Sequence, residues 1–214
     1  MAFTLFPEGV PKTKRMMDLA ITLPGLIIAL PVMGVVAVGL ALTAGSPVIF
    51  RQARGGYRNR VFNLYKFRTM NDRRDASGAL LPDAQRLTRL GNLLRATSLD
   101  ELPGLLNVVN GEMSLVGPRP LFARYLERYT PEQRRRHDVL PGITGWAQVN
   151  GRNALSWEAK FALDVWYVDH WSLGLDFKIL AMTLGKVLRR EGISQPGHAT
   201  APEYMGEEKE KENA

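Results

Sequence analysis

A long apolar segment near the N-terminus constrains this chain more than any other feature of its sequence. No charged residue lies between Leu19 and Phe50, and the most apolar part runs from Leu19 to Thr43. As one helix with a rise of ~1.5 Å per residue, that part would measure roughly 37 Å, enough to cross a bilayer core of ~30 Å. We therefore predict a membrane segment. A buried core helix of a soluble protein is the less favoured interpretation, because uncharged runs of this length are unusual there.

Two features favour a bent helix that enters and leaves the membrane by the same leaflet. Pro24 and Pro31 interrupt the segment, and an interior proline removes a backbone hydrogen bond and clashes with the preceding turn. Cationic residues flank both ends, which draws both ends toward the cytoplasmic side. We predict a re-entrant helix-break-helix bent near Pro31, rather than a kinked span. The flanking cations are Lys12, Lys14, Arg15, Arg51, Arg54, Arg58 and Arg60.

The composition excludes several classes of protein. The chain has 28 Lys and Arg against 21 Asp and Glu, a formal charge of +7, with 45% apolar residues and no cysteine. This excludes a disordered chain, a disulfide scaffold, a thiol nucleophile and a Cys-ligated metal. The cationic surplus predicts a polyanionic partner, which is nucleic acid, a phosphorylated small molecule or an anionic membrane leaflet.

The remaining patterns predict an α/β fold that is mostly helical with short strands. We expect an N-terminal membrane helix over residues 1–45, a compact cytosolic domain over 46–202 and a charged, disordered tail over 203–214. The strands expected are 48–50 and 61–67, forming a hairpin around Gly55 and Gly56, and a brief apolar stretch at 113–116. The helices expected are 84–95 after an Asp83 cap, 103–109, 121–136, and two amphipathic helices at the membrane interface, 156–170 and 175–190; residues 141–146 are expected to form a rigid loop.

Asp100 and Glu101 are adjacent carboxylates with two interpretations. In the first, Ser98 and Glu101 form a capping box at a helix start, but Pro103 would then fall inside the helix, where its missing N–H is a loss. In the second, Pro103 is the first helical residue and the two carboxylates lie just outside the positive helix end. There they would stay ionised and could hold a divalent cation, and one could act as a nucleophile toward phosphorus.

Four cations could accompany these carboxylates in binding phosphate. Pro118 and Pro120 restrain the backbone on either side of Arg119, and a tight turn precedes Arg152. Rigid guanidinium groups suit bidentate phosphate capture, although a solvated surface cation is the ordinary interpretation of each. The other two candidates are Lys66 and Arg95. Walker, dinucleotide-binding, Gly-x-Ser-x-Gly and His-Glu-x-x-His motifs are all missing from the sequence.

These residues belong to a series of motifs through which nearly the whole chain resembles the small monotopic phosphoglycosyl transferases, also called bacterial sugar transferases. The motifs are Lys14-Arg15-x-x-Asp18, Pro31 in the apolar segment, Tyr65-Lys66-Phe67-Arg68-Thr69-Met70, Ser98-Leu99-Asp100-Glu101-Leu102-Pro103, Gly111-Glu112-Met113-Ser114, Val116-Gly117-Pro118-Arg119-Pro120, and the segment from Pro141 to Arg152.

The resemblance implies transfer of a sugar 1-phosphate from a UDP-sugar to undecaprenyl phosphate, with Mg2+, at the cytoplasmic face of the bacterial inner membrane. It implies that Asp100 attacks the β-phosphorus, expels UMP and carries the phosphosugar. Glu101 would help to hold Mg2+ or handle the acceptor's proton. Lys66, Arg95, Arg119 and Arg152 would hold phosphates, and Arg15 and Asp18 would flank the membrane segment near the acceptor. Residues 192–200 resemble those of members that use UDP-N,N'-diacetylbacillosamine.

Two other hypotheses remain open from the sequence. The chain could be a non-catalytic basic protein that binds membrane or nucleic acid through its arginines, or a transferase whose apolar segment truly spans the membrane. Nucleic acid is the least expected partner, because membrane and phosphate together account for the charge. The sequence determines neither the sugar nor the oligomeric state.

Overall fold

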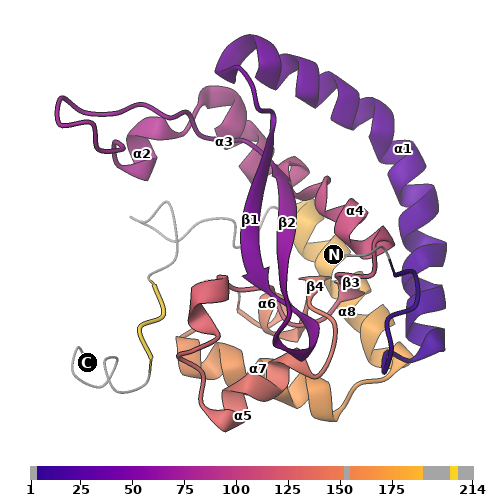
Figure 1. Cartoon of the computed structure of the whole chain (residues 1–214). Helices are drawn as coiled ribbons and strands as arrows, with labels where there is room; N and C mark the ends of the chain where they lie inside the picture. Colours follow the sequence, from indigo (N-terminus) through magenta and orange to yellow (C-terminus); the bar gives the residue numbers. More distant parts are fainter. Residues whose placement is uncertain (1–3, 152–154, 190–202, 207–214) are drawn as a thin grey trace.

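The computed structural model describes residues 4–151, 155–189 and 203–206. Within them the protein is mostly helical with a few short strands, as predicted (Figure 1). The helices are α1 (Lys12–Ala44), α2 (Asp83–Arg86), α3 (Arg89–Ala96), α4 (Gly104–Val109), α5 (Pro131–Arg134), α6 (Trp146–Val149), α7 (Trp157–Asp169) and α8 (Leu173–Arg189). The strands are β1 (Ile49–Gly55), β2 (Val61–Phe67), β3 (Ser114–Val116) and β4 (Gly142–Thr144), with single 3-10 turns η1 (Tyr57–Asn59), η2 (Leu99–Glu101), η3 (Ala123–Tyr125) and η4 (Arg135–His137).

The apolar segment forms one continuous helix, α1, of 33 residues. The predicted break at Pro31 is therefore wrong as a break in secondary structure: the helix continues through Pro24 and Pro31 and takes the form of an arc (Figure 1). An interior proline can bend a helix without ending it, because the hydrogen bonds on either side remain. Among the described residues, α1 is the one helix long and apolar enough to cross a membrane.

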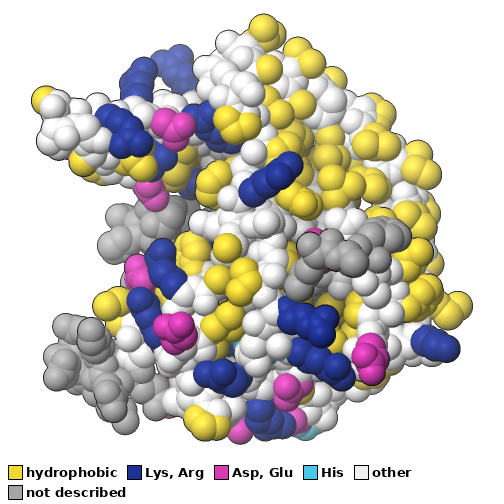
Figure 2. Space-filling view, in the orientation of Figure 1, with side chains coloured by type: hydrophobic (Ala, Val, Ile, Leu, Met, Phe, Trp, Pro, Cys, Tyr) yellow, Lys and Arg dark blue, Asp and Glu magenta, His cyan; other side chains and the backbone are white. Residues whose placement is uncertain are grey.

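One face of α1 packs along the rest of the protein and the other is exposed. The buried positions Thr22, Ala29, Val36 and Leu40 lie on one side of the helix, and the last two join a cluster with Phe67 and Leu94. Figure 2 shows hydrophobic side chains gathered over α1 on the outer surface. The exposed apolar residues there are Met16, Ile21, Leu23, Ile27, Ile28, Leu30, Val32, Val35, Val38 and Leu42.

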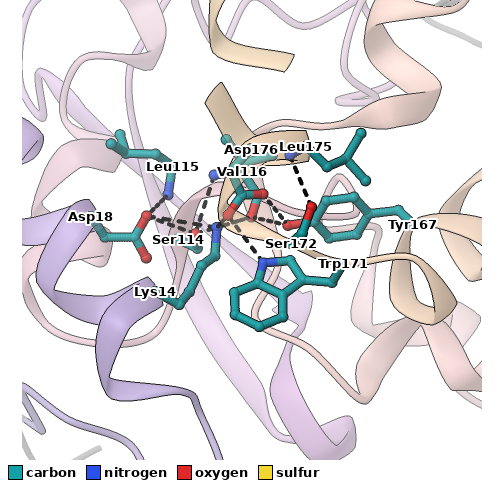
Figure 3. A network of polar contacts seen from close by, with 10 residues as sticks. All are labelled: Lys14, Asp18, Ser114, Leu115, Val116, Tyr167, Trp171, Ser172, Leu175 and Asp176. Atoms are coloured by element: carbon teal, nitrogen blue, oxygen red, sulfur yellow. Dashed lines mark hydrogen bonds and ion pairs between the residues drawn. The ribbon is translucent and has the colours of Figure 1, made fainter. Parts of the chain in front are cut away.

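A buried ion pair joins the start of α1 to α8 (Figure 3). Lys14 Nζ lies 2.7 Å from Asp176 Oδ2 and donates to the carbonyl of Val116 at 2.9 Å. Tyr167 OH and Trp171 Nε1 also donate to the Asp176 carboxylate, at 2.7 and 3.1 Å. Both charged side chains are almost fully buried, so the desolvated charges depend on these bonds. We call this group of five residues the α1–α8 junction.

Two small sheets complete the core. β1 and β2 form the predicted antiparallel hairpin, in a register that pairs Ile49 with Phe67 and Gly55 with Val61. β3 pairs in parallel with β4, so part of the predicted loop 141–146 is a strand. Sequence alone did not indicate this pairing, because β4 is three residues long and its partner is distant. The main hydrophobic core lies beneath both sheets and includes Phe62, Leu64, Val108, Met113, Leu115, Val116, Val149, Tyr167 and Ile179.

Two predicted helices are divided in the structure. The helix expected over 84–95 stops after Arg86, because Leu87 is extended and bridges to Met70. Thr88 then caps α3 by accepting a hydrogen bond from the backbone N–H of Gly91 at 2.9 Å.

The prediction of a single polar helix over 121–136 is wrong. The chain there forms η3, α5 and η4 in succession. Thr130 and Gln133 form a capping box, and Pro131 follows the cap directly, which starts a new helix at that point. Tyr125 and Tyr129 are buried in an aromatic cluster, and this packing outweighs the local helical pattern.

The segment 203–206 packs against the protein, although it falls in the tail predicted to be disordered. Tyr204 is 1% exposed and lies among Tyr125, Tyr129, Trp157 and Phe161. Its hydroxyl donates to Gln133 Oε1 at 2.8 Å. The sequence did not predict the packing of Tyr204, because a single tyrosine among acidic residues gives no periodic signal. The predicted helices 156–170 and 175–190 correspond to α7 and α8.

Replacing Lys14 by Met should leave Asp176 buried without its cation. Removal of one partner of a buried ion pair costs about 3–5 kcal/mol, so we expect Lys14→Met to lower the Tm by roughly 10 °C in detergent. Lys12→Met removes the same charge from an exposed position of the same helix and is the matched control. Equal Tm values for the two variants would contradict a stabilising role for the junction.

Candidate active site

Asp100 and Glu101 lie in η2, the short turn between α3 and α4. Ser98 before them has a left-handed backbone with φ of 57°, and its side chain makes no capping hydrogen bond, so the capping-box interpretation is wrong. Pro103 is the cap residue of α4, so the helix begins at Gly104, one residue later than predicted. The missing N–H of proline costs nothing there, and the two carboxylates stand outside the helix as the second interpretation required.

Glu101 binds two cations through a single oxygen atom. Lys66 Nζ and Arg119 Nη2 each lie 2.7 Å from Glu101 Oε1. Lys66 comes from β2 and Arg119 from the loop after β3, so three distant segments meet at this atom. Burial alone would raise the pKa of Glu101, but Arg119 and Lys66 outweigh it and hold that pKa well below its usual range. Glu101 is therefore an anion at neutral pH.

Asp100 differs from its neighbour. It is 9% exposed, and burial followed by the charge of Glu101 raises its pKa, against the opposing effects of Lys66, Arg95 and Arg119. The sequence predicted that both carboxylates stay ionised, without distinguishing them. The structure instead moves their pKa values in opposite directions, which is typical of carboxylate pairs with separate roles.

Arg95 approaches this pair from the end of α3. Its Nε donates to Thr69 Oγ1 at 3.0 Å, and its charge acts on Asp100. Gly91 lets α3 lie close to Thr69, because a Cβ there would come within 2.0 Å of the Thr69 carbonyl oxygen. The helix thus carries Arg95 to the site through close backbone packing.

Arg119 is positioned through its backbone. Arg136 Nη2 donates to the carbonyl of Arg119 at 2.7 Å, and Arg136 is itself in a buried ion pair with Asp164 at 2.6 Å. The neighbouring carbonyl of Pro118 accepts from the N–H of Gly142 at 3.0 Å. These contacts, in addition to the two flanking prolines, limit the freedom of the loop.

A small cleft opens beside Glu101. Its described lining includes Arg54, Leu64, Tyr65, Lys66, Glu101, Gly104, Met113, Arg119, Pro120, Gly142 and Ile143. Asp100 is outside this lining set, one residue from Glu101.

Arg54 is the site residue that the sequence analysis missed. It was grouped with the cations flanking the membrane segment, but it lines the cleft. A signal was available: in the hairpin register Gln52 pairs with Leu64 and Arg54 with Phe62, both partners being buried. Alternation along a strand therefore places Arg54 on the inward-facing side, unlike the exposed Arg51.

Arg15 and Asp18 are outside the described lining of the cleft. Both are fully buried at the start of α1, where Arg15 Nη2 donates to the carbonyl of Val109 at 2.9 Å. Asp18 Oδ1 accepts from Ser114 Oγ at 2.9 Å and from the N–H of Leu115 at 3.1 Å (Figure 3). These hydrogen bonds give both side chains a structural role at the start of α1, and their expected role near the acceptor stays a prediction. Arg152 and residues 192–200 lie outside the described residues.

Asp100 and Glu101 are adjacent carboxylates that could hold a metal ion. Among the described residues no cluster of three or more His, Cys, Asp or Glu side chains could hold a metal ion. Asp100 and Glu101 alone fit Mg2+, which commonly takes one or two carboxylates and completes its shell with water and substrate phosphates.

The proteins to which this chain is similar are sugar transferases. The family model described as "Bacterial sugar transferase" matches residues 10–190. The sugar transferase EpsL of Bacillus subtilis is 62% identical, with 77% of this chain and 82% of that protein covered. A UDP-glucose:undecaprenyl-phosphate glucose-1-phosphate transferase of Caulobacter vibrioides is 38% identical, with 86% and 75% covered.

Other relatives are longer proteins. The UDP-galactose-lipid carrier transferase of Erwinia amylovora is 40% identical over 84% of this chain, and the match covers 41% of that protein. The chain thus spans under half of the length of this relative.

Replacing Glu101 by Gln removes a negative charge that raises the pKa of Asp100 and leaves two cations uncompensated. Both changes favour the ionised form, so the pKa of Asp100 should fall in Glu101→Gln. A ¹³C NMR titration of aspartate carboxyl carbons measures this, with Asp100→Asn identifying the resonance. Glu132→Gln changes an exposed carboxylate and should leave the titration unaltered. A higher pKa of Asp100 in Glu101→Gln would contradict this electrostatic arrangement.

Proposed function

The chain belongs to the bacterial sugar transferase family, and we propose that it transfers a sugar 1-phosphate from a UDP-sugar to undecaprenyl phosphate and releases UMP. The observation that carries the proposal is the Asp100–Glu101 pair surrounded by Lys66, Arg95 and Arg119. Relatives that carry out such a transfer by name support it.

The charges of the site suit phosphoryl transfer. This chemistry requires mainly that the reacting groups be positioned and that charge on the phosphate oxygens be neutralised. Lys66 and Arg119 are fixed by Glu101, and Arg95 by Thr69. The cations are thus held in place before a substrate arrives.

In the first step, Asp100 is the nucleophile. One of its carboxylate oxygens forms a bond to the β-phosphorus of the UDP-sugar, while the bond from that phosphorus to the bridging oxygen breaks and UMP leaves. The protein then carries the sugar phosphate on Asp100. The step needs the ionised carboxylate, and the nearby cations favour that form.

In the second step, an oxygen of undecaprenyl phosphate attacks the same phosphorus. The bond to Asp100 breaks, its carboxylate is restored, and undecaprenyl diphosphate sugar is the product. Glu101 suits holding the cations better than taking up a proton, because its pKa is held well below its usual range.

We propose that Asp100 and Glu101 also hold Mg2+. Glu101 Oε1 already accepts from two cations, which leaves its Oε2 and the Asp100 carboxylate as donors. When bound, the ion would neutralise charge on the phosphate oxygens. Arg152 remains a predicted phosphate ligand.

The donor sugar is the open part of this function. Relatives named for their substrate act on glucose or galactose, whereas the resemblance at residues 192–200 favours an N-acetylated amino sugar such as UDP-N,N'-diacetylbacillosamine. UMP release measured over a panel of UDP-glucose, UDP-galactose and UDP-linked N-acetylated amino sugars distinguishes these candidates.

We propose that α1 is re-entrant, at the cytoplasmic face of the bacterial inner membrane. Packing supports this: Lys14 near its start binds Asp176, and Leu40 near its end packs against Phe67 and Leu94. Both parts of the helix therefore contact the same domain. A helix that crossed the bilayer would separate its far end from that domain, whereas an arc with its exposed apolar face in one leaflet keeps both contacts (Figure 1).

If Asp100 is the nucleophile, protein incubated with a UDP-sugar labelled in the sugar and without acceptor should become labelled at Asp100 and release an equal amount of UMP. Asp100→Asn should lose the label and at least ~1000-fold of turnover. Asp75→Asn, in an exposed loop, is the control and should behave as the unaltered protein. Mass spectrometry of the peptide that contains residue 100 identifies the labelled site.

Two outcomes would contradict this scheme in different ways. UMP release without label on the protein would exclude the covalent intermediate but keep the transfer. Full function in Asp100→Asn, with membrane or nucleic-acid binding that falls steeply as salt rises, would favour the non-catalytic basic protein.

The membrane arrangement predicts equal accessibility before and after α1. The chain has no cysteine, so Glu8→Cys and Arg60→Cys each introduce a single thiol at an exposed position. A membrane-impermeant maleimide should label neither variant in intact spheroplasts and both after lysis. Labelling of Glu8→Cys alone in intact spheroplasts would indicate a true span.

A further inference from the structure

The cleft beside Glu101 carries more positive than negative charge. Its described lining contains three cations, Arg54, Lys66 and Arg119, and one carboxylate, Glu101. Lys66 and Arg119 share that carboxylate through one oxygen atom. Arg54 forms no ion pair with any carboxylate of the described residues. The described lining therefore has an excess of positive charge, which an anionic ligand could balance.

Arg54 is held firmly, but by neutral groups. Its guanidinium lies 4.1 Å from the centre of the Phe122 ring, and Nη1 donates to the carbonyl of Pro120 at 3.2 Å. Nη2 donates to Gln52 Oε1. A guanidinium has five N–H donors, and these two hydrogen bonds leave three for other acceptors. One of them, the buried Nε, has no partner in the described structure.

Arg136 shows how this protein satisfies a structural arginine. It is 2% exposed, pairs with Asp164 at 2.6 Å and donates to the carbonyl of Arg119. Arg54 also donates to a backbone carbonyl, but it forms no ion pair with a carboxylate of the described residues, and it borders the cleft. A guanidinium held by stacking, with free donors and no anion, is arranged for a bidentate acceptor such as phosphate.

Burial, and then the nearby charge of Arg119, lower the pKa of Arg54 to about 10. Arg54 is still a cation at neutral pH, so a desolvated positive charge remains beside another one. A bound anion would offset both the desolvation of Arg54 and its repulsion from Arg119.

We propose that Arg54 is a phosphate-binding residue of the cleft and acts with Arg119 on a phosphate group of a substrate. This rests on the proposed function, in which both substrates carry phosphate. The donor diphosphate and the phosphate of the lipid acceptor share the chemistry that Arg54 would recognise. Measuring each substrate separately distinguishes between them.

Arg54→Gln tests this, because Gln keeps a donor for the Pro120 carbonyl but removes the charge. Arg51→Gln removes the same charge from an exposed position of the same strand and is the matched control. We expect Arg54→Gln to raise the KM of one substrate about tenfold or more. The KM values for the UDP-sugar and for undecaprenyl phosphate come from UMP release, and UDP binding is measured by titration calorimetry without turnover.

Salt dependence separates a phosphate contact from a structural role. A charge that binds phosphate makes affinity fall as salt rises, so Arg54→Gln should weaken the affected substrate at low salt and show a shallower salt dependence than the unaltered protein. Arg51→Gln should match the unaltered protein in KM and in salt dependence.

The outcomes are distinct. Weaker UDP binding and a raised donor KM would assign Arg54 to the donor, and a raised acceptor KM alone would assign it to the acceptor. Unchanged KM values, or a raised KM with an unaltered salt dependence, would overturn the proposal. Failure of the unaltered protein to bind UDP or to release UMP from any UDP-sugar would instead contradict the proposed function.

Discussion

One oxygen atom of Glu101 accepts from both Lys66 and Arg119, and the arrangement of the site depends on this shared contact. The contact joins a strand of the hairpin, the turn before α4 and the loop after β3. Glu101 binds both cations through Oε1, whereas its neighbour Asp100 has a raised pKa and no such contact among the described residues. Two carboxylates that are adjacent and alike in sequence thus have different surroundings, and their pKa values move in opposite directions.

The membrane helix and the site are connected through β3. The carbonyl of Val116 accepts from Lys14 of α1 and from Tyr167 of α7, and Arg119 follows three residues later. On the other side, Arg136 holds the Arg119 carbonyl. The loop that presents Arg119 is therefore restrained on one side by α1 and on the other by Arg136 of η4, which pairs with Asp164 of α7. These contacts fix the position of Arg119 relative to α1.

The sequence predicted those features that depend on local pattern. The hairpin, α7, α8 and the placement of Asp100 and Glu101 before a proline-initiated helix follow from alternation, periodicity and the geometry of Pro103. Features set by distant partners were not predicted. Arg15 was assigned to the membrane surface, because its burial depends on carbonyl groups such as that of Val109 far along the chain. Arg54 was misassigned for a similar reason, since its inward orientation depends on the strand register.

The buried face of α1 bears on how the protein can be divided. Thr22, Ala29, Val36 and Leu40 lie against the domain, and Lys14 supplies the cation for Asp176. A fragment that began after α1 would expose the apolar surface that α1 covers and leave the buried Asp176 carboxylate without its cation. Helix α1 is thus an integral part of the folded domain, and removing it is not a route to a soluble fragment of the protein.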